Sequence, residues 1–207
     1  MLKQPTAGIV LAAGMSTRMG ITKQLMELGG KPLLAWVVEA AFRSELEQVI
    51  LVLGHDAEKV SATLGPLCEH ERIEIVVNER YREGMSTSLQ AGLRHAQGQF
   101  PSVMFLLGDQ PLVTTGMINL LLRRFRDSDQ DICVPVYAGR QGNPVCISSL
   151  FYDEILSIRG DLGAREVIRN HPDRILHVEI DDPLYFMDLD SLEDKEKLLS
   201  FLEAGQT

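Results

Sequence analysis

Residues Gly8–Lys23 read GIVLAAGMSTRMGITK, a short apolar run that opens into a loop of small and polar residues. The run Gly8–Leu11 is typical of a buried strand. In an open α/β sheet, ligands bind beyond the carboxyl ends of the strands, so a loop at this position is well placed for binding. Small residues let phosphate oxygens approach backbone N–H groups, while Ser16, Arg18 and Lys23 supply hydrogen bonds and positive charge. The composition of this loop suits a triphosphate.

The rest of the chain alternates between short apolar runs and segments with a helical spacing of apolar residues. The further strand-like runs are Val49–Leu53, Ile73–Val77, Val103–Leu107 and Ile132–Val136. The helical segments are Leu33 to about Ser44, Ala57–Leu64, Thr87–Ala96 and Thr114–Arg126. This alternation predicts βαβ units, and therefore an α/β fold with a mainly parallel central sheet covered by helices on both faces.

After Val136 the pattern is less regular. We expect two short helices there, a strand near Tyr185–Met187 that rejoins the sheet, and a final helix from about Leu192. No internal repeat and no long linker divides the sequence, so residues 1–207 are expected to form one domain.

The overall composition restricts the class of function. The sequence has 207 residues, of which 45% are hydrophobic, and a formal net charge of -9. This acidic balance argues against nucleic acid as a partner, because such binding depends on many Lys and Arg contacts with phosphates. The apolar runs are far shorter than the about 20 residues that span a bilayer, and no signal peptide is recognisable. Three scattered cysteines, Cys68, Cys133 and Cys146, indicate a reducing compartment, so we expect a soluble cytoplasmic protein.

Two familiar phosphate-binding loops are excluded by the spacing within the first loop. The dinucleotide fingerprint needs G-x-G-x-x-G, and the P-loop needs a lysine directly after its second glycine, whereas Gly20 is followed by Ile21. The alternative to phosphate binding is a long turn in which Gly14 and Gly20 adopt unusual backbone angles and the basic side chains are solvated. Composition by itself leaves both interpretations open.

The pattern L-A-A-G-x-S-x-R-M-G-x-x-K at Leu11–Lys23 resembles the signature of the MobA-like nucleotidyltransferases, in particular the molybdenum cofactor cytidylyltransferase branch. The resemblance implies a three-layer, Rossmann-like nucleotidyltransferase fold of the GT-A-like kind. It also implies that this loop holds the triphosphate of CTP, with Arg18 and Lys23 as catalytic residues on its phosphates. The nucleotide-binding residues are then Leu11, Ala12, Ala13, Gly14, Ser16, Arg18, Lys23, Gly84, Ser88 and Gly108.

Ala13 occupies a position at which the guanylyl-transferring relatives resemble L-A-G-G. A Cβ in a loop close to the base narrows the slot, which disfavours a purine and tolerates a pyrimidine. CTP is therefore expected to be preferred over GTP. The alternative is that Ala13 packs against the sheet and that the base is selected elsewhere.

A carboxylate follows the apolar strand Val103–Leu107, in the sequence Gly108-Asp109-Gln110-Pro111. Asp109 therefore emerges at the same edge of the sheet as the first loop. Carboxylate oxygens are ligands that Mg²⁺ shares with substrate phosphates, although an aspartate here could also cap a turn. The resemblance to the family's G-D-x-P metal motif favours Asp109 as a catalytic residue and Mg²⁺ ligand.

A second source of carboxylates is Phe186-Met187-Asp188-Leu189-Asp190. In an extended segment Asp188 and Asp190 point the same way. The alternative is that Ser191 caps the last helix and the acids complement its dipole. The comparable family stretch resembles D-I-D-T-P-E-D, and here Ser191 and Leu192 replace threonine and proline. By resemblance Asp188 is the second Mg²⁺ ligand and Asp190 is the other candidate.

The segment Asn78–Leu89 connects the third strand to a helix. Thr87 with Gln90 fits a capping box, so the hydroxyl groups of this segment could serve only the end of the helix. The family pattern G-M-x-x-S-L-x-x-G resembles residues 84–92, however, and it implies contact with the nucleobase. Ser88 and the backbone of Gly84 are therefore candidates for reading the polar edge of the base.

Two later loops resemble acceptor-side elements of the family. Their candidate residues are Gly142, Asn143, Pro144, Gly163, Ala164 and Arg165. The N–H groups of Gly163 and Ala164 at a helix start favour an anion, and Arg165 could clamp a phosphate. The alternative for the second loop is a capped helix start. The family more often has His at the position of Asn143.

The resemblance extends from Ile9 to about Asp194 and implies an Mg²⁺-dependent enzyme. The implied reaction transfers CMP from CTP to molybdenum cofactor (molybdopterin), forming molybdopterin cytosine dinucleotide and releasing pyrophosphate. Residues from 1 to about 110 would bind the nucleotide and those from about 111 to 207 the acceptor. Two alternatives stay open: a related nucleotidyltransferase with another triphosphate or a sugar or alcohol phosphate, and a non-catalytic nucleotide- or cofactor-binding maturation factor for a molybdoenzyme client.

Overall fold

The computed structural model describes residues 5–15, 22–189 and 192–204. Within these ranges, eight strands form the main sheet in the order β10-β7-β9-β6-β1-β4-β5, with β8 paired to β7. Their bounds are β1 Thr6–Ala12, β4 Gln48–Leu53, β5 Ile73–Val77, β6 Ser102–Leu107, β7 Ile132–Tyr137, β8 Arg140–Gln141, β9 Val145–Ser148 and β10 Ile175–Glu179. Only β8 and β9 run antiparallel to their neighbours. The predicted mainly parallel sheet is confirmed.

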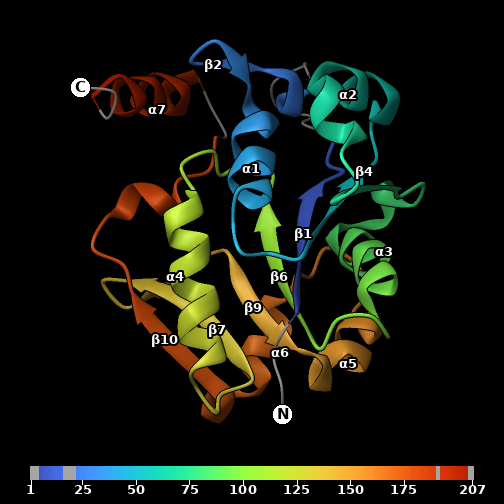
Figure 1. Ribbon diagram of the computed structural model, residues 1–207, viewed down its shortest axis with the longest axis vertical. Helices are drawn as coiled ribbons and strands as arrows, with labels where there is room; N and C mark the ends of the chain where they lie inside the picture. Colours follow the sequence, from blue (N-terminus) through green and yellow to red (C-terminus); the bar gives the residue numbers. More distant parts are fainter. Residues whose placement is uncertain (1–4, 16–21, 190–191, 205–207) are drawn as a thin grey trace.

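Helices cover both faces of this sheet (Figure 1). One layer contains α1 Leu33–Phe42, α2 Ala57–Leu64 and α4 Thr115–Arg126. The opposite layer contains α3 Met85–Ala96, α5 Tyr152–Ser157 and α6 Arg165–Asn170. The fold is therefore the expected three-layer α/β arrangement. In residues 5–15, 22–189 and 192–204, no helix has both the length and the apolar character needed to cross a membrane.

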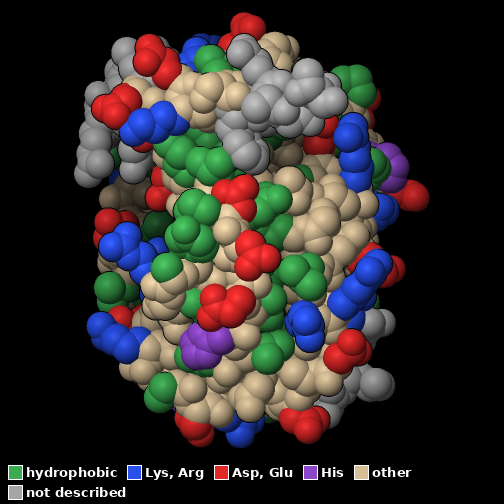
Figure 2. All heavy atoms as spheres, turned by 90° about the vertical axis from the view of Figure 1, so that its left-hand side faces the viewer, with side chains coloured by type: hydrophobic (Ala, Val, Ile, Leu, Met, Phe, Trp, Pro, Cys, Tyr) green, Lys and Arg blue, Asp and Glu red, His purple; other side chains and the backbone are tan. Residues whose placement is uncertain are grey.

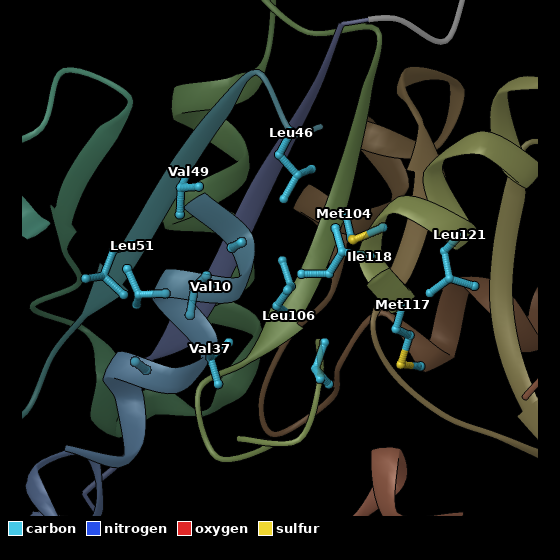
Figure 3. Packing of buried hydrophobic residues seen from close by; sticks show 14 of the residues in the cluster. Val10, Val37, Leu46, Val49, Leu51, Met104, Leu106, Met117, Ile118 and Leu121 are labelled. Carbon is cyan, nitrogen blue, oxygen red and sulfur yellow. The ribbon is translucent and has the colours of Figure 1, made fainter. Parts of the chain in front are cut away.

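Successive residues of each central strand face opposite helical layers. In β1, Val10 faces α1 and α4, while Ile9 faces α3. Figure 3 shows the first of these layers, with Val10 beside Val37 of α1 and Met104 beside Ile118 of α4. Because both faces are buried, the strands are continuous apolar runs and do not alternate with polar residues.

A small third cluster lies at the end of the molecule to which β1 and β6 point. It joins the hairpin β2 Glu27–Leu28 and β3 Lys31–Pro32 to the last helix, α7 Leu192–Ala204 (Figure 1). Its buried members are Met26, Leu28, Leu33, Leu112, Leu189 and Leu198. Short 3-10 helices complete the described elements: η1 Lys23–Leu25, η2 Gly65–Glu69, η3 Tyr81–Glu83, η4 Ser149–Phe151, η5 Pro172–Arg174 and η6 Pro183–Phe186.

The predicted strand near Tyr185–Met187 is wrong. Residues Pro183–Phe186 form η6, because Pro183 lies in its first turn and the Asp182 side chain accepts a hydrogen bond from Leu184 N. The last strand of the sheet is β10, which pairs in parallel with β7.

The predicted capping box at Thr87 and Gln90 is also wrong. Helix α3 begins at Met85, two residues before Thr87, and its N-cap is Gly84. Gln90 Nε2 donates instead to the carbonyl oxygens of Leu156 and Ile158, at 3.1 and 2.7 Å.

β10 forms one edge of the sheet, and its His177 and Glu179 are exposed. Figure 2 shows this side of the molecule, where acidic side chains gather in the middle of the face and Lys and Arg lie mainly toward its margins. Charge on an edge strand opposes edge-to-edge pairing with another sheet. A face of this sign also repels the phosphate backbone of nucleic acids.

Two helical glycines are expected to respond oppositely to alanine. A Cβ on Gly92 in α3 would lie 2.5 Å from Ile9 Cγ2 and 2.9 Å from Val52 Cγ2, whereas a Cβ on Gly116 in α4 would meet its nearest atom at 3.7 Å. Gly92→Ala should lower the free energy of unfolding by about 1–3 kcal/mol, because β-branched neighbours cannot move aside. Gly116→Ala should raise it by up to about 1 kcal/mol. Urea unfolding measures both changes, and a stabilised Gly92→Ala variant would contradict the packing.

Candidate active site

The ends of β1 and β6 border a cavity of about 600 Å³. These strands pair in parallel with Leu11 opposite Leu107, and Gly108 N donates to Leu11 O at 2.9 Å. The loop after β1 and the carboxylate after β6 therefore meet at one edge of the sheet. The cavity brings together most of the residues predicted to bind a nucleotide, namely Leu11, Ala12, Ala13, Gly14, Lys23, Gly84, Ser88 and Gly108, together with Asp109. Ser16 and Arg18 lie outside the described residues.

Gln24 holds the first loop in place. Its Nε2 donates to Ala12 O at 2.9 Å and to Gly14 O at 3.0 Å, and the residue is buried. A Cβ on Gly14 would meet no atom within 4 Å, so the backbone of the loop is open to the cavity there. An anion can approach this backbone closely, as phosphate binding requires.

Thr22, near the end of the same loop, is fastened to the turn between β4 and α2. Its hydroxyl donates to Asp56 Oδ2 at 2.5 Å. This hydrogen bond lowers the pKa of the Asp56 carboxyl group. Asp56 is thus an anion that accepts the bond throughout the neutral pH range.

Lys23 and Asp109 form an ion pair across the cavity. Lys23 Nζ lies 2.9 Å from Asp109 Oδ2, although the residues are 86 positions apart. The lysine side chain is 13% exposed and the aspartate side chain 35% exposed. The ammonium group can therefore interact both with Asp109 and with an anion in the cavity.

Asp188 lies next to the Asp109 segment. Gln110 Nε2 donates to Asp188 Oδ1 at 2.8 Å, and Leu189 N donates to Asp109 O at 3.1 Å. The two acidic segments are thus joined by a side-chain and a backbone hydrogen bond. Asp190 lies outside the described residues.

The donor set of this edge fits a hard divalent cation. Asp109 and Asp188 both line a second cavity and offer carboxylate oxygens, the ligands that Mg²⁺ and Mn²⁺ prefer. In the described part of the chain, no group of three or more His, Cys, Asp or Glu side chains could hold an ion. An ion at Asp109 and Asp188 would therefore complete its coordination with water and substrate phosphates.

Asn78 fixes the polar side of the first cavity. Its Nδ2 donates to Thr87 Oγ1 at 2.9 Å and to Ser88 Oγ at 3.0 Å, and all three residues are buried. The Asn78 backbone is held in turn, since its N–H donates to Leu53 O at 2.7 Å. Ser88 therefore presents a hydroxyl oxygen of fixed position at the cavity wall.

The second cavity has a volume of about 820 Å³ and is lined by Asn143, Gly163, Ala164 and Arg165 of the predicted acceptor loops. It meets the first cavity at a common wall formed by Leu11, Met85, Leu107, Asp109 and Asp161. Asn143 reaches this edge because β9 runs antiparallel to β6, with Val145 opposite Phe105.

Two of the predicted acceptor residues do not line the second cavity. Gly142 packs against Phe186, since a Cβ on Gly142 would lie 1.7 Å from Phe186 Cδ1. Pro144 is buried. Gly142 and Pro144 therefore pack the loop against the rest of the protein. The polar side chains that this loop presents to the second cavity are those of Gln141 and Asn143.

A Rossmann-like sheet with an open loop after its first strand and a strand-end carboxylate between two cavities is the arrangement expected of a nucleotidyltransferase. Comparison with known proteins agrees with this class. The chain belongs to the family of the MobA-like NTP transferase domain, which matches residues 8–175.

Among curated proteins, the bifunctional protein GlmU of Trichlorobacter lovleyi is 33% identical over 118 residues. The match covers 56% of this chain and 25% of GlmU. The chain spans about a quarter of the length of the curated relatives that it matches.

Solved structures match almost the whole chain. An Rv0371c homolog from Mycobacterium sp. strain JC1 has 29% identity and a TM-score of 0.84, covering 98% of this chain and 99% of that one. Rv0371c of Mycobacterium tuberculosis in complex with manganese has 26% identity and a TM-score of 0.79, covering 95% and 99%. Molybdopterin-guanine dinucleotide biosynthesis protein A of Archaeoglobus fulgidus has 17% identity and a TM-score of 0.69, covering 96% and 99%, which shows a common fold.

Sequence reasoning missed three polar residues that shape the cavities: Gln24, Asn78 and Asp161. Asn78 directly follows the strand Ile73–Val77, which is a signal that was available in the sequence. Gln24 and Asp161 carry no such signal, because they act on backbone groups of other segments.

Replacing Lys23 should change metal affinity in the absence of nucleotide. Lys23→Met removes the cation that competes for Asp109, so Mn²⁺ should bind about twofold to fivefold more tightly, the range of a partly exposed ion pair. Electron paramagnetic resonance of free Mn²⁺ measures the change. The matched control is Lys31→Met, whose Nζ lies 2.9 Å from Glu39 Oε2 and outside both cavities. Equal affinities in the wild type and Lys23→Met would remove Asp109 from the metal site.

Proposed function

We propose that this protein is a cytoplasmic, Mg²⁺-dependent nucleotidyltransferase that transfers CMP from CTP to molybdenum cofactor. The products are molybdopterin cytosine dinucleotide and pyrophosphate. The observation that carries the proposal is the pair of cavities that meet at Asp109, one beside the phosphate-binding loop and the other beside Arg165. The first, built mainly by residues from 1 to about 110, would hold CTP, and the second, built mainly by residues from about 111 to 207, would hold the acceptor.

The reaction needs alignment and charge neutralisation from the protein. An oxygen of the acceptor phosphate attacks the α-phosphorus of CTP, a new P–O bond forms, and the bond to pyrophosphate breaks in line with it. The acceptor phosphate is already an anion, so the step requires neither a protein nucleophile nor a general base. The common wall at Asp109 brings the two phosphates together.

Basic and acidic side chains have separate tasks in this scheme. Lys23 leaves Asp109 for the triphosphate and stabilises the departing pyrophosphate, and Arg18 has the same role. Asp109 and Asp188 hold Mg²⁺, with Asp190 as the other candidate. The ion, when bound, supplies positive charge to the phosphates. The manganese complex of Rv0371c supports a divalent ion in this fold.

Base selection is assigned to Ala13 and Ser88. Ala13 is 4% exposed, packs in the core beside α3 and also lines the first cavity. A Cβ on Gly54 would lie 2.9 Å from Ala13 Cβ and 2.8 Å from Tyr81 Cβ, so this wall is tightly packed. Because the wall is tightly packed, the Ala13 methyl group cannot shift to make room for a larger base. Ser88, whose Oγ accepts a hydrogen bond from Asn78, would pair with the edge of cytosine.

Molybdenum cofactor is proposed as acceptor because the first loop resembles the cytidylyltransferase branch and because a protein named for molybdopterin-guanine dinucleotide synthesis has the same fold. Transfer to a sugar or alcohol phosphate is the second candidate, which the match to GlmU over 118 residues favours. A client molybdoenzyme would receive the product of the first reaction.

The proposal predicts that Asp109→Asn abolishes most turnover without unfolding the protein. The change keeps the size of the side chain and removes its charge, so pyrophosphate release from CTP with molybdenum cofactor and Mg²⁺ should fall about a hundredfold or more. Asp129→Asn, an exposed site outside both cavities, is the control. Near-normal turnover in a folded Asp109→Asn variant would exclude Asp109 from the reaction. If the wild type releases no pyrophosphate with any of four triphosphates, molybdenum cofactor is excluded as the acceptor.

A second prediction concerns the base. The wild type should have a higher kcat/KM for CTP than for UTP, GTP and ATP, and Ala13→Gly should raise the relative kcat/KM for GTP. A single methyl group is worth about 1–3 kcal/mol of discrimination, or roughly tenfold to two-hundredfold. Pyrophosphate release with all four triphosphates measures it. GTP preference in the wild type would overturn the cytidylyl assignment, and an unchanged CTP preference in Ala13→Gly would overturn only the role of Ala13.

A further inference from the structure

Helix α3 has no capping side chain in its own sequence. Its N-cap is Gly84, which has no side chain to accept a hydrogen bond from the first turn. The first two N–H groups are bound instead by another segment. Met85 N donates to Asp161 Oδ1 at 3.2 Å, and Ser86 N donates to Gly160 O at 3.1 Å. The loop between α5 and α6 therefore caps α3 from a distance of 76 positions in the sequence.

The contact between this loop and α3 is close. Gly84 has a φ of 109°, and a Cβ there would lie 2.4 Å from the backbone C and O atoms of Gly160. A Cβ on Gly163 would lie 3.0 Å from Met85 Sδ. Further along α3, Gln90 Nε2 binds the carbonyl oxygens of Leu156 and Ile158. The helix and the loop are thus joined along more than one turn.

This contact lies between the two cavities. Met85 and Asp161 line both of them. On one side α3 continues to Ser88 in the first cavity, and on the other side the loop continues to Arg165 in the second. A change in the position of Asp161 would therefore alter the walls of both cavities.

We propose that Asp161 is a positioning residue that holds the base-binding end of α3 in place for the nucleotide and keeps the acceptor loop against it. The inference rests on the proposed function for the identity of the nucleotide. The carboxylate satisfies an N–H group at the helix start and complements the helix dipole, as an N-cap residue does within one helix. It touches neither reacting phosphate in this role, so it affects binding more than the chemical step.

The test compares Asp161→Ala, which removes the acceptor atom, with Asp161→Asn, which keeps an oxygen at the same place. The control is Asp153→Ala, an acid in the first turn of α5 that lines neither cavity. Calorimetry with CTP and Mg²⁺ should give a Kd about fivefold higher for Asp161→Ala, the fold-change that corresponds to a typical N-cap. Asp161→Asn and Asp153→Ala should stay within about twofold of the wild type.

Hydrogen exchange separates this inference from the proposed function. The amides of Met85 and Ser86 should exchange at least about fivefold faster in Asp161→Ala than in Asp161→Asn, with or without a nucleotide. Steady-state kinetics should show a raised KM for CTP with kcat retained. Equal exchange rates in the two Asp161 variants, or an Asp161→Asn variant as impaired as Asp161→Ala, would overturn the positioning role. If the wild type does not bind CTP, the proposed function fails and the exchange rates decide the role of Asp161.

Discussion

β1 and β6 pair in parallel at the centre of the sheet, and the close approach of their ends determines the geometry of both cavities. Gly108 makes this approach possible, because a Cβ there would lie 3.0 Å from Ala12 Cβ, Leu11 O and Leu34 Cδ1. With glycine, Gly108 N reaches Leu11 O, and the next residue, Asp109, lies opposite Lys23. A strand that ended one residue earlier or later would turn the carboxylate to the other face of the sheet.

The central strands could be predicted because burial on both faces leaves a plain signal in the sequence. The strands at 49–53 and 103–107 are continuous apolar runs between polar loops, and the structure reproduces them to within one residue. The half-exposed strand β10 carries His177 and Glu179 and gives no such run. Local sequence does not show that this strand pairs with β7, because the two strands are far apart in the chain. The apolar segment near Tyr185–Met187 was therefore predicted as the last strand, but η6 occupies it.

The residues of the candidate site also fall into those that the sequence could reveal and those that it could not. Residues that follow a central strand or belong to a local motif, such as Lys23 and Asp109, could be named from the sequence. Gln24 and Asp161 could not, because their partners are carbonyl and N–H groups of segments brought near only by the fold. Gly142 shows a related point, because a loop motif does not reveal which of its residues a ring such as Phe186 covers.

The antiparallel strand β9 explains how one sheet borders two cavities. Because β9 reverses direction beside β6, the loop that precedes it lies at the same edge as the loops that follow the parallel strands. The second cavity is therefore walled largely by residues after 140, while the loop after β1 and Ser88, which Asn78 holds by a hydrogen bond, line the first. In the proposed reaction, only groups that reach the common wall at Asp109 can react. Side chains on either side can then change the base or the acceptor that binds, while the place where the new P–O bond forms stays the same.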